Sequence, residues 1–149
     1  FDFDDWPSGR YATETMQGTR PARAAAACWA TMRHLGRDGY MDLASGVKAT
    51  TDRLVAGIAA IGDLAPLPEP EAGLVVITST SVDLFAVSEA LEERGFPHGM
   101  TREPPGLHFT MNPVEDTRPV DMLLEALEGA VNEVRGGRQV SDGTEGSYI

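Results

Sequence analysis

Two long stretches in the first half of the chain carry apolar residues at helical spacing. Pro21 suits the first turn of a helix, and residues 22–35 after it are nearly all apolar. Gly36 and Gly39 break this pattern, and in 41–61 apolar residues again fall on one helical face. The pattern therefore predicts two long helices separated by the two glycines.

The second half of the chain combines strand and helix patterns. Residues 74–79 are typical of a short buried strand, and in 107–111 apolar and polar side chains alternate, as in a strand with one face on the core. Residues 83–94 and 120–135 carry apolar side chains on one helical stripe. We therefore predict an α/β sandwich of the α+β type: two long helices and a short, mainly antiparallel sheet covered by helices on one face.

The chain divides into four stretches by composition. Residues 1–19 lack sustained periodicity and are expected to form an extended arm, and residues 20–62 hold the long helices. Residues 63–136 would form a small α/β domain, after the proline series at 66, 68 and 70 has stopped the second helix. The polar, glycine-rich tail 137–149 is expected to be mobile unless another domain holds it.

Length and charge limit the class of protein. With 149 residues, of which 42% are hydrophobic, the chain can form one ordinary domain with a core. A net charge of −11 argues against nucleic acid or an anionic membrane as partner, because phosphate binding needs clustered Lys and Arg. No apolar run approaches the ~20 residues of a membrane span. The one cysteine, Cys28, is expected to be a small core residue, and its lack of a disulfide partner favours a cytoplasmic setting.

Two familiar motifs fail on closer comparison. Ser45 to Lys48 fit the Ser-x-x-Lys of penicillin-binding enzymes, but the companion motifs are absent, and a solvated helix face is the better interpretation. Asp2, Asp4 and Asp5 lack the glycine and terminal glutamate of a calcium loop, so we expect them on the polar surface. Neither motif is assigned a function.

The three histidines do not form a recognisable metal site. His34, His98 and His108 are far apart in the sequence, and no pair has the spacing of metal ligands on a helix. His108 lies on the predicted polar face of a strand and could line a pocket, but we favour a structural role. We therefore predict no metal site, and we assign no catalytic residue.

The turn before the first helix holds the residues best suited to bind an anion. A helix N-terminus offers unpaired N–H groups, Gly18 lets a backbone approach closely, and Thr19 adds a hydroxyl donor. Together these groups could hold a phosphate. From these residues alone an ordinary N-cap at Thr19 is the favoured alternative, and both interpretations stay open.

Four segments in register resemble one known enzyme family. They are Ser8-Gly9-Arg10-Tyr11, Gly18-Thr19-Arg20-Pro21, Trp29-Ala30-Thr31-Met32 and Gly36-Arg37-Asp38-Gly39-Tyr40. The pattern is similar to that of the pyridoxal-phosphate (PLP) lyases and decarboxylases of the sphingosine-1-phosphate lyase and glutamate decarboxylase group. In that family the segment crosses a dimer interface and touches the cofactor phosphate held by the other subunit.

The resemblance implies roles for three residues. Gly18 and Thr19 match a Gly-Ser pair of the family and would donate hydrogen bonds to the phosphate of PLP. Tyr11 matches a tyrosine that helps to hold the phosphate of the substrate. Arg20 belongs to the motif as well, and either a structural ion pair or a part in positioning the arm would explain it.

The resemblance also implies that the chain is the C-terminal part of a larger enzyme. It would be the small domain of a fold type I PLP enzyme, with a PLP-binding domain before Phe1. The family's Schiff-base lysine would lie in that missing domain, since Lys48 is the only lysine here. We expect the chain to be inactive alone and to act in a cytoplasmic homodimer whose site is shared between the subunits and takes a small amine substrate.

Three hypotheses for the reaction follow. The leading one is a carbon–carbon lyase that resembles sphingosine-1-phosphate lyase and cleaves a phosphorylated amino alcohol. Glu14 stands where those lyases commonly have Pro, and it would repel a phosphorylated substrate unless Arg10 or Arg23 offset its charge. The second hypothesis is an amino-acid decarboxylase of the same fold. The third is a binding module that reuses this domain without catalysis.

Overall fold

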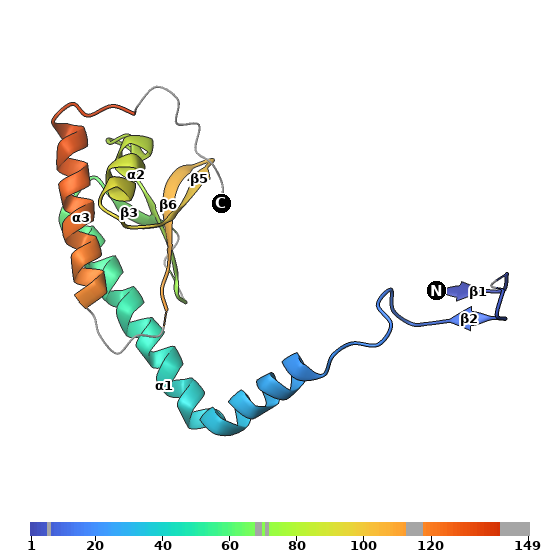
Figure 1. Ribbon diagram of the computed structural model, residues 1–149. Helices are drawn as coiled ribbons and strands as arrows, with labels where there is room; N and C mark the ends of the chain where they lie inside the picture. The colour runs from blue at the N-terminus through green and yellow to red at the C-terminus, as the bar shows by residue number, and fades with distance from the viewer. Residues whose placement is uncertain (6, 68–69, 71, 113–117, 141–149) are drawn as a thin grey trace. The chain divides into compact units, whose positions relative to one another are not determined.

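The computed structural model describes residues 1–5, 7–67, 70, 72–112 and 118–140. They form two compact units, Phe1–Gly39 and Tyr40–Ile149, and each is described by itself. Figure 1 traces both units from the N-terminus in blue to the C-terminal helix in red. The part of the predicted tail beyond residue 140 lies outside the described residues, and the predicted division into four stretches stays a prediction.

The first unit opens with a small antiparallel hairpin. Strands β1 (Asp2–Phe3) and β2 (Tyr11–Ala12) pair so that Phe3 lies opposite Tyr11. The Arg10 guanidinium closes the hairpin by binding both carboxylate oxygens of Asp2, at 2.9 Å from Nε and 2.5 Å from a terminal nitrogen. Because the strands are two residues long, hydrogen bonds and this ion pair, rather than a core, hold the hairpin together.

Helix α1 (Arg23–Ile61) is interrupted at Gly36, which has φ 60° and ψ −171°. Glycine adopts this conformation readily because it has no Cβ, whereas other residues are strained there. The prediction of two long helices is therefore confirmed. Gly39 was also expected to break the helix, but it lies inside the second helical segment, where the absence of a side chain lowers helix propensity without preventing a helix.

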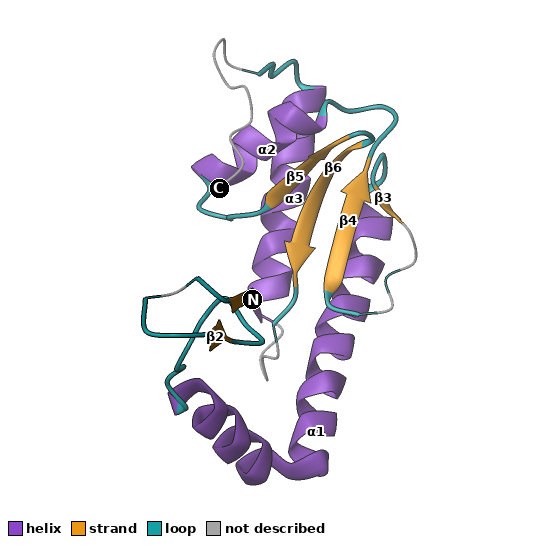
Figure 2. Cartoon of the chain, turned by 90° about the vertical axis from the view of Figure 1, so that its right-hand side faces the viewer, coloured by secondary structure: helices purple, strands orange, loops and turns teal. Residues whose placement is uncertain are grey.

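The second unit contains one four-stranded antiparallel sheet. Its strand order is β3 (Ala65–Leu67), β4 (Leu74–Thr78), β6 (Pro105–Thr110) and β5 (Gly99–Arg102). Helices α2 (Leu84–Glu93) and α3 (Arg118–Arg135) follow β4 and β6. Figure 2 shows α3 and the second segment of α1 passing behind the sheet. The predicted fold class is confirmed.

The core lies between this sheet and the helices. Strands β4 and β6 turn alternate residues toward the helices, and Val75, Ile77 and Leu107 are fully buried there. The largest fully buried side chains from the helices are Leu54, Ile58, Val87, Leu91, Leu127 and Val131. All three helices of the second unit therefore depend on the same apolar sheet face.

Within the four-stranded sheet, the sequence patterns missed two strands. The proline series suggested only a break, yet Pro66 lies in β3, an edge strand, where a residue without an N–H group can be accommodated. Strand β5 is the other edge and has no apolar alternation of its own. It is a strand because its residues pair with β6, as Met100 does with Leu107. Long-range pairing rather than local preference creates both edges.

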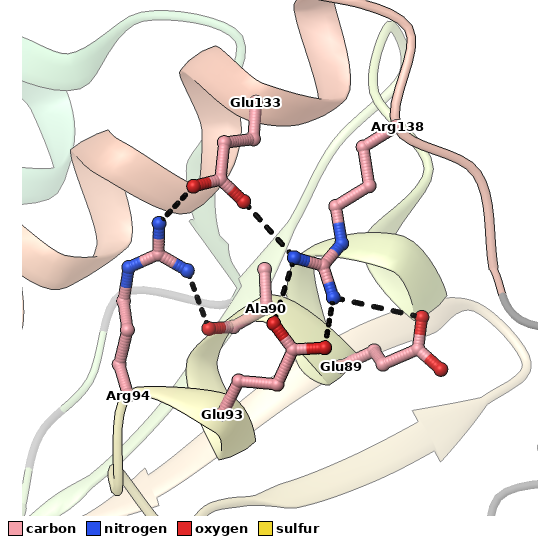
Figure 3. Close-up of polar contacts among 6 residues, drawn as sticks. All are labelled: Glu89, Ala90, Glu93, Arg94, Glu133 and Arg138. Carbon is pink, nitrogen blue, oxygen red and sulfur yellow. Dashed lines mark hydrogen bonds and ion pairs between the residues drawn. The ribbon is translucent and has the colours of Figure 1, made fainter.

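Ionic contacts connect α2, α3 and the segment after α3 (Figure 3). Arg138 binds the carboxylate of Glu93 at 2.6 and 2.9 Å and that of Glu133 at 3.0 Å. Arg94 donates to the Ala90 carbonyl at 2.6 Å and also binds Glu133. The Arg138 guanidinium lowers the pKa of Glu93, and Arg94 together with Arg138 lowers the pKa of Glu133.

These lowered pKa values predict a dependence of stability on pH. A carboxyl whose pKa is lower in the folded state stabilises the protein above its unfolded pKa, about 4.3, and this contribution is lost as the pH falls through the folded pKa. We expect the free energy of unfolding to decrease between about pH 6 and about pH 3, and to decrease less steeply in Glu133→Gln. Urea titrations at several pH values measure this slope. Glu128→Gln, an exposed carboxyl of the same helix outside this network, is the control and should keep the wild-type slope.

Truncation of the core should unfold the second unit more easily. Leu127 is fully buried in α3, and Leu127→Ala should lower the free energy of unfolding by about 2–5 kcal/mol because it leaves a cavity. Met122 is 59% exposed on the same helix, and Met122→Ala should change the free energy of unfolding by less than about 0.5 kcal/mol. Urea unfolding followed by far-ultraviolet circular dichroism compares the two. Equal losses would mean that α3 is not packed as described.

Candidate functional site

Gly18 and Thr19 lie in an exposed turn that precedes α1. The first helical hydrogen bond runs from the Ala26 N–H to the Ala22 carbonyl at 2.9 Å, so Ala22 occupies the N-cap position. Thr19 is thus three residues too early to cap the helix, which removes the N-cap interpretation. It also means that the N–H groups and the hydroxyl available for an anion belong to the turn itself. They are not the free N–H groups of the first turn of the helix.

The surroundings of Gly18 are open. No heavy atom lies within 4 Å of the position that a Cβ on Gly18 would take, and its φ is outside the left-handed region. Nothing within the described part of its own unit therefore requires a glycine here. A glycine at such a place is useful when a group from outside approaches the backbone closely.

The hydrogen-bond donors of this turn are of the types that bind phosphate oxygens. Backbone N–H groups and a threonine hydroxyl donate hydrogen bonds to anionic oxygens, and charged acceptors make such bonds stronger. Arg20 and Arg23 are exposed on either side of Pro21 and add positive charge to the same stretch. The space beside the Gly18 backbone is not filled by any described side chain.

Tyr11 lies on β2 and is 47% exposed. Its ring does not come within 4 Å of the Cβ position of Gly18, so the structure does not bring these two predicted site residues together. The resemblance assigned Tyr11 to the substrate and Gly18 to the cofactor, and separate positions on the arm are compatible with separate ligands.

Arg10 is not available to offset Glu14 in this structure. Its guanidinium is bound by Asp2 and lies 3.8 Å from Asp4, and the contact with Arg10 lowers the pKa of Asp2. The sequence offered Arg10 or Arg23 as the cation that would neutralise Glu14. Arg10 instead pairs with Asp2, which leaves Arg23 as the candidate to offset the charge of Glu14.

Cys28 is exposed, in contrast to the expectation that it is a core residue. The expectation rested on the apolar character of residues 22–35, but their helix is exposed throughout, apart from half-buried Leu35. Trp29 is 62% exposed and Met32 is 50% exposed on the same helix. This part of α1 thus has an apolar surface that its own unit does not cover.

Two of the three histidines share one cavity, although sequence spacing gave no sign of it. His98 and His108 line a cavity in the second unit, while His34 belongs to the first unit. Recognition of His98 would have required strand β5, which brings Gly99 next to His108. Within the described ranges, no group of three His, Cys, Asp or Glu side chains could hold a metal ion. No described helix is long and apolar enough to cross a membrane.

The sequence is similar to enzymes of two activities. A sphingosine-1-phosphate lyase of Dictyostelium discoideum is 29% identical over 146 residues, which is 97% of this chain and 27% of that protein. A probable L-tyrosine/L-aspartate decarboxylase of Methanothermobacter thermautotrophicus is 34% identical over 123 residues, or 80% of this chain and 34% of that protein. The chain spans about a quarter to a third of the length of these relatives. No protein-family model matches it.

Solved structures share this fold. The sphingosine-1-phosphate lyase of Burkholderia pseudomallei matches with a TM-score of 0.79 and 27% identity, over 92% of this chain and 31% of that one. A glutamate decarboxylase of Lactobacillus brevis matches with a TM-score of 0.73 over 94% of this chain and 34% of that one. At 12% identity, the second match shows the fold alone.

The α+β unit with its long broken helix is thus the small domain of a fold type I PLP enzyme. The sequence identity to lyases and decarboxylases indicates which enzymes of this class are related to the chain. The chain is homologous to a part of the sphingosine-1-phosphate lyases and of the group II decarboxylases.

Proposed function

We propose that this chain serves as the C-terminal part of a PLP-dependent carbon–carbon lyase that resembles sphingosine-1-phosphate lyase. The observation that carries the proposal is the exposed Gly18-Thr19 turn, in a chain that is 29% identical over 146 residues to such a lyase. The reaction would be the retro-aldol cleavage of a phosphorylated amino alcohol.

In this proposal the arm supplies anion recognition. The N–H groups of Gly18 and Thr19 and the Thr19 hydroxyl donate to the phosphate of PLP held mainly by another subunit. PLP, when bound, supplies an electron sink for the carbon–carbon bond that breaks. The absence of a side chain at Gly18 lets the phosphate approach the backbone.

Tyr11 would contact the substrate rather than the cofactor. Its phenol can donate a hydrogen bond to a phosphate oxygen. The hairpin, closed by Arg10 and Asp2, would hold this side chain in position. This chain would then bind and orient two phosphate groups, while the residues that move protons lie in the preceding domain.

The same proposal includes a homodimer. Trp29 and Met32 are exposed on an apolar helix, and exposed apolar patches of this kind mark interaction surfaces. A second subunit and the PLP-binding domain would cover them. We also propose a cytoplasmic location, on the basis of the unpaired Cys28.

A decarboxylase is the second candidate function. The 34% identity to a probable L-tyrosine/L-aspartate decarboxylase favours it, as does Glu14, which would oppose a phosphorylated substrate. The longer enzyme that contains this chain separates the two candidates. Release of an aldehyde from a phosphorylated amino alcohol supports the lyase, whereas release of carbon dioxide from an amino acid supports the decarboxylase.

The role of Thr19 can be tested by cofactor affinity. In the longer enzyme, Thr19→Val should weaken PLP binding about tenfold, because a charge-assisted hydrogen bond is lost. Thr19→Ser keeps the hydroxyl and should stay close to wild type. Thr31→Val removes a hydroxyl that bonds the Ala27 carbonyl within α1, and it is the matched control. PLP titration by absorbance measures all four proteins, and unchanged affinity in Thr19→Val would remove Thr19 from the site.

The 149-residue chain should be inactive alone. Lys48, its only lysine, is exposed and paired with Asp52 at 2.5 Å on α1, away from the Gly18-Thr19 turn in sequence. We expect neither aldehyde nor carbon dioxide release from the chain with PLP and substrate, and activity after a preceding PLP-binding domain is added. Turnover by the chain alone would contradict the proposal. A stable chain that binds a ligand without turnover, and that gains no activity from such a domain, would favour the binding module.

A further inference from the structure

The four-stranded sheet of the second unit has one face turned away from the helices. Side chains alternate along a strand, and Val75, Ile77 and Leu107 are buried on the helical side, so their neighbours point to the other side. We call this other side the open face. Its residues are Ala65 and Leu67 of β3, Leu74, Val76 and Thr78 of β4, Gly106, His108 and Thr110 of β6, and Gly99 and Thr101 of β5. Figure 2 looks onto the open face, with α3 and the second segment of α1 behind the sheet.

Every residue of the open face is uncharged, although 23% of the chain is charged. Antiparallel sheets with one face in water usually carry polar side chains on that face. Helix α3 has the composition of a solvated surface, since its exposed residues include Glu125, Glu128 and Glu133. The open face has no such residue, and its composition is that of a surface covered by another part of a protein.

Apolar side chains extend over the open face from its edge to its centre. Leu67 on β3 lies opposite Val76 on β4, and Leu74 is two residues from Val76 on the same strand. Leu74 is 55% exposed and Leu67 is 41% exposed, so neither is covered by the rest of the second unit. Exposed apolar patches of this kind mark interaction surfaces.

The half of the open face formed by β6 and β5 is flat. An added Cβ on Gly99 would come within 1.9 Å of Nε2 of His108, so the imidazole lies along the sheet over Gly99. An added Cβ on Gly106 would come within 2.7 Å of Oγ1 of Thr101, so this side chain likewise lies over a glycine. Because small-molecule sites are concave, a flat uncharged surface suits a large partner better than a small ligand.

We propose that the open face is covered by the PLP-binding domain of the same polypeptide, in an uncharged contact centred on Leu74 and Val76. This inference rests on the proposed function, in which such a domain precedes the chain. Its support is the size of the related enzymes: the matched region is 31% of the chain of the Burkholderia pseudomallei lyase and 34% of that of the Lactobacillus brevis decarboxylase. Most of each related chain is thus available to cover this face.

A second copy of the chain is a poorer occupant of the open face. Before residue 40 the chain has five acidic and five basic residues, which cancel, so residues 40–149 carry the whole net charge of −11. Two second units brought together would repel each other, and the open face offers no charged pair to offset the repulsion. A domain of the same polypeptide has a high effective concentration, so it can form a contact that no charge guides.

Thiol labelling tests whether the open face is covered. Leu74→Cys and Thr110→Cys are prepared in the 149-residue chain and in the longer enzyme, and iodoacetamide labelling of each site is followed by peptide mass spectrometry. Both thiols should react at least about tenfold more slowly in the longer enzyme, because a covered thiol reacts only after local opening. Met122→Cys on α3, where Met122 is 59% exposed, is the matched control and should react equally in both proteins. Equal rates at positions 74 and 110 in the two proteins would overturn the proposal, as would slow labelling in the 149-residue chain itself.

Photo-cross-linking identifies the occupant. A leucine analogue with a diazirine group is introduced at Leu74 of the longer enzyme, and the enzyme is irradiated and denatured. Cross-links to the preceding domain of the same polypeptide should leave a product with the mass of one chain. A product with the mass of two chains, or no cross-link to the preceding domain, would overturn the proposal.

These measurements are separate from the test of the proposed reaction, because they use neither substrate nor turnover. A covered open face in an enzyme that releases no aldehyde would refute the lyase and leave this inference standing. An active lyase with an exposed open face would refute this inference alone.

Discussion

Burial of one face of the β3-β4-β6-β5 sheet is the interaction on which the second unit depends. Ile77 and Leu107 are paired across β4 and β6, and both are fully buried against the helices. Hydrophobic burial is the dominant favourable contribution to folding, so this contact fixes the helices. The edge strands and the ionic contacts of Arg138 depend on this burial as well.

The first unit lacks such a contact. All of the buried residues among those described belong to the second unit. The hairpin and the turn at Gly18 are ordered locally, by the Arg10 and Asp2 pair and by short-range hydrogen bonds. Residues proposed to bind phosphate are therefore carried by a segment that has no core of its own among the described residues. This agrees with a site shared between subunits.

Sequence patterns predicted the elements that carry their own periodicity. These elements are the two segments of α1, helices α2 and α3, and strands β4 and β6. The fold class followed from them and was also predicted. Strands β3 and β5 could not be predicted, since they exist through pairing with neighbours. The exposure of Cys28 was missed because an apolar sequence does not reveal which surface covers it. The shared cavity of His98 and His108 depends on β5 and was missed with it.

The break at Gly36 affects how variants of this chain would be interpreted. Its φ of 60° with ψ of −171° belongs to a region that is essentially restricted to glycine. Any side chain at this position would strain the peptide where the two segments of α1 meet. Gly36 belongs to neither the Gly18-Thr19 turn nor the core of the second unit, so a substitution there would change the course of the backbone at the break while the proposed ligand-binding groups stay intact.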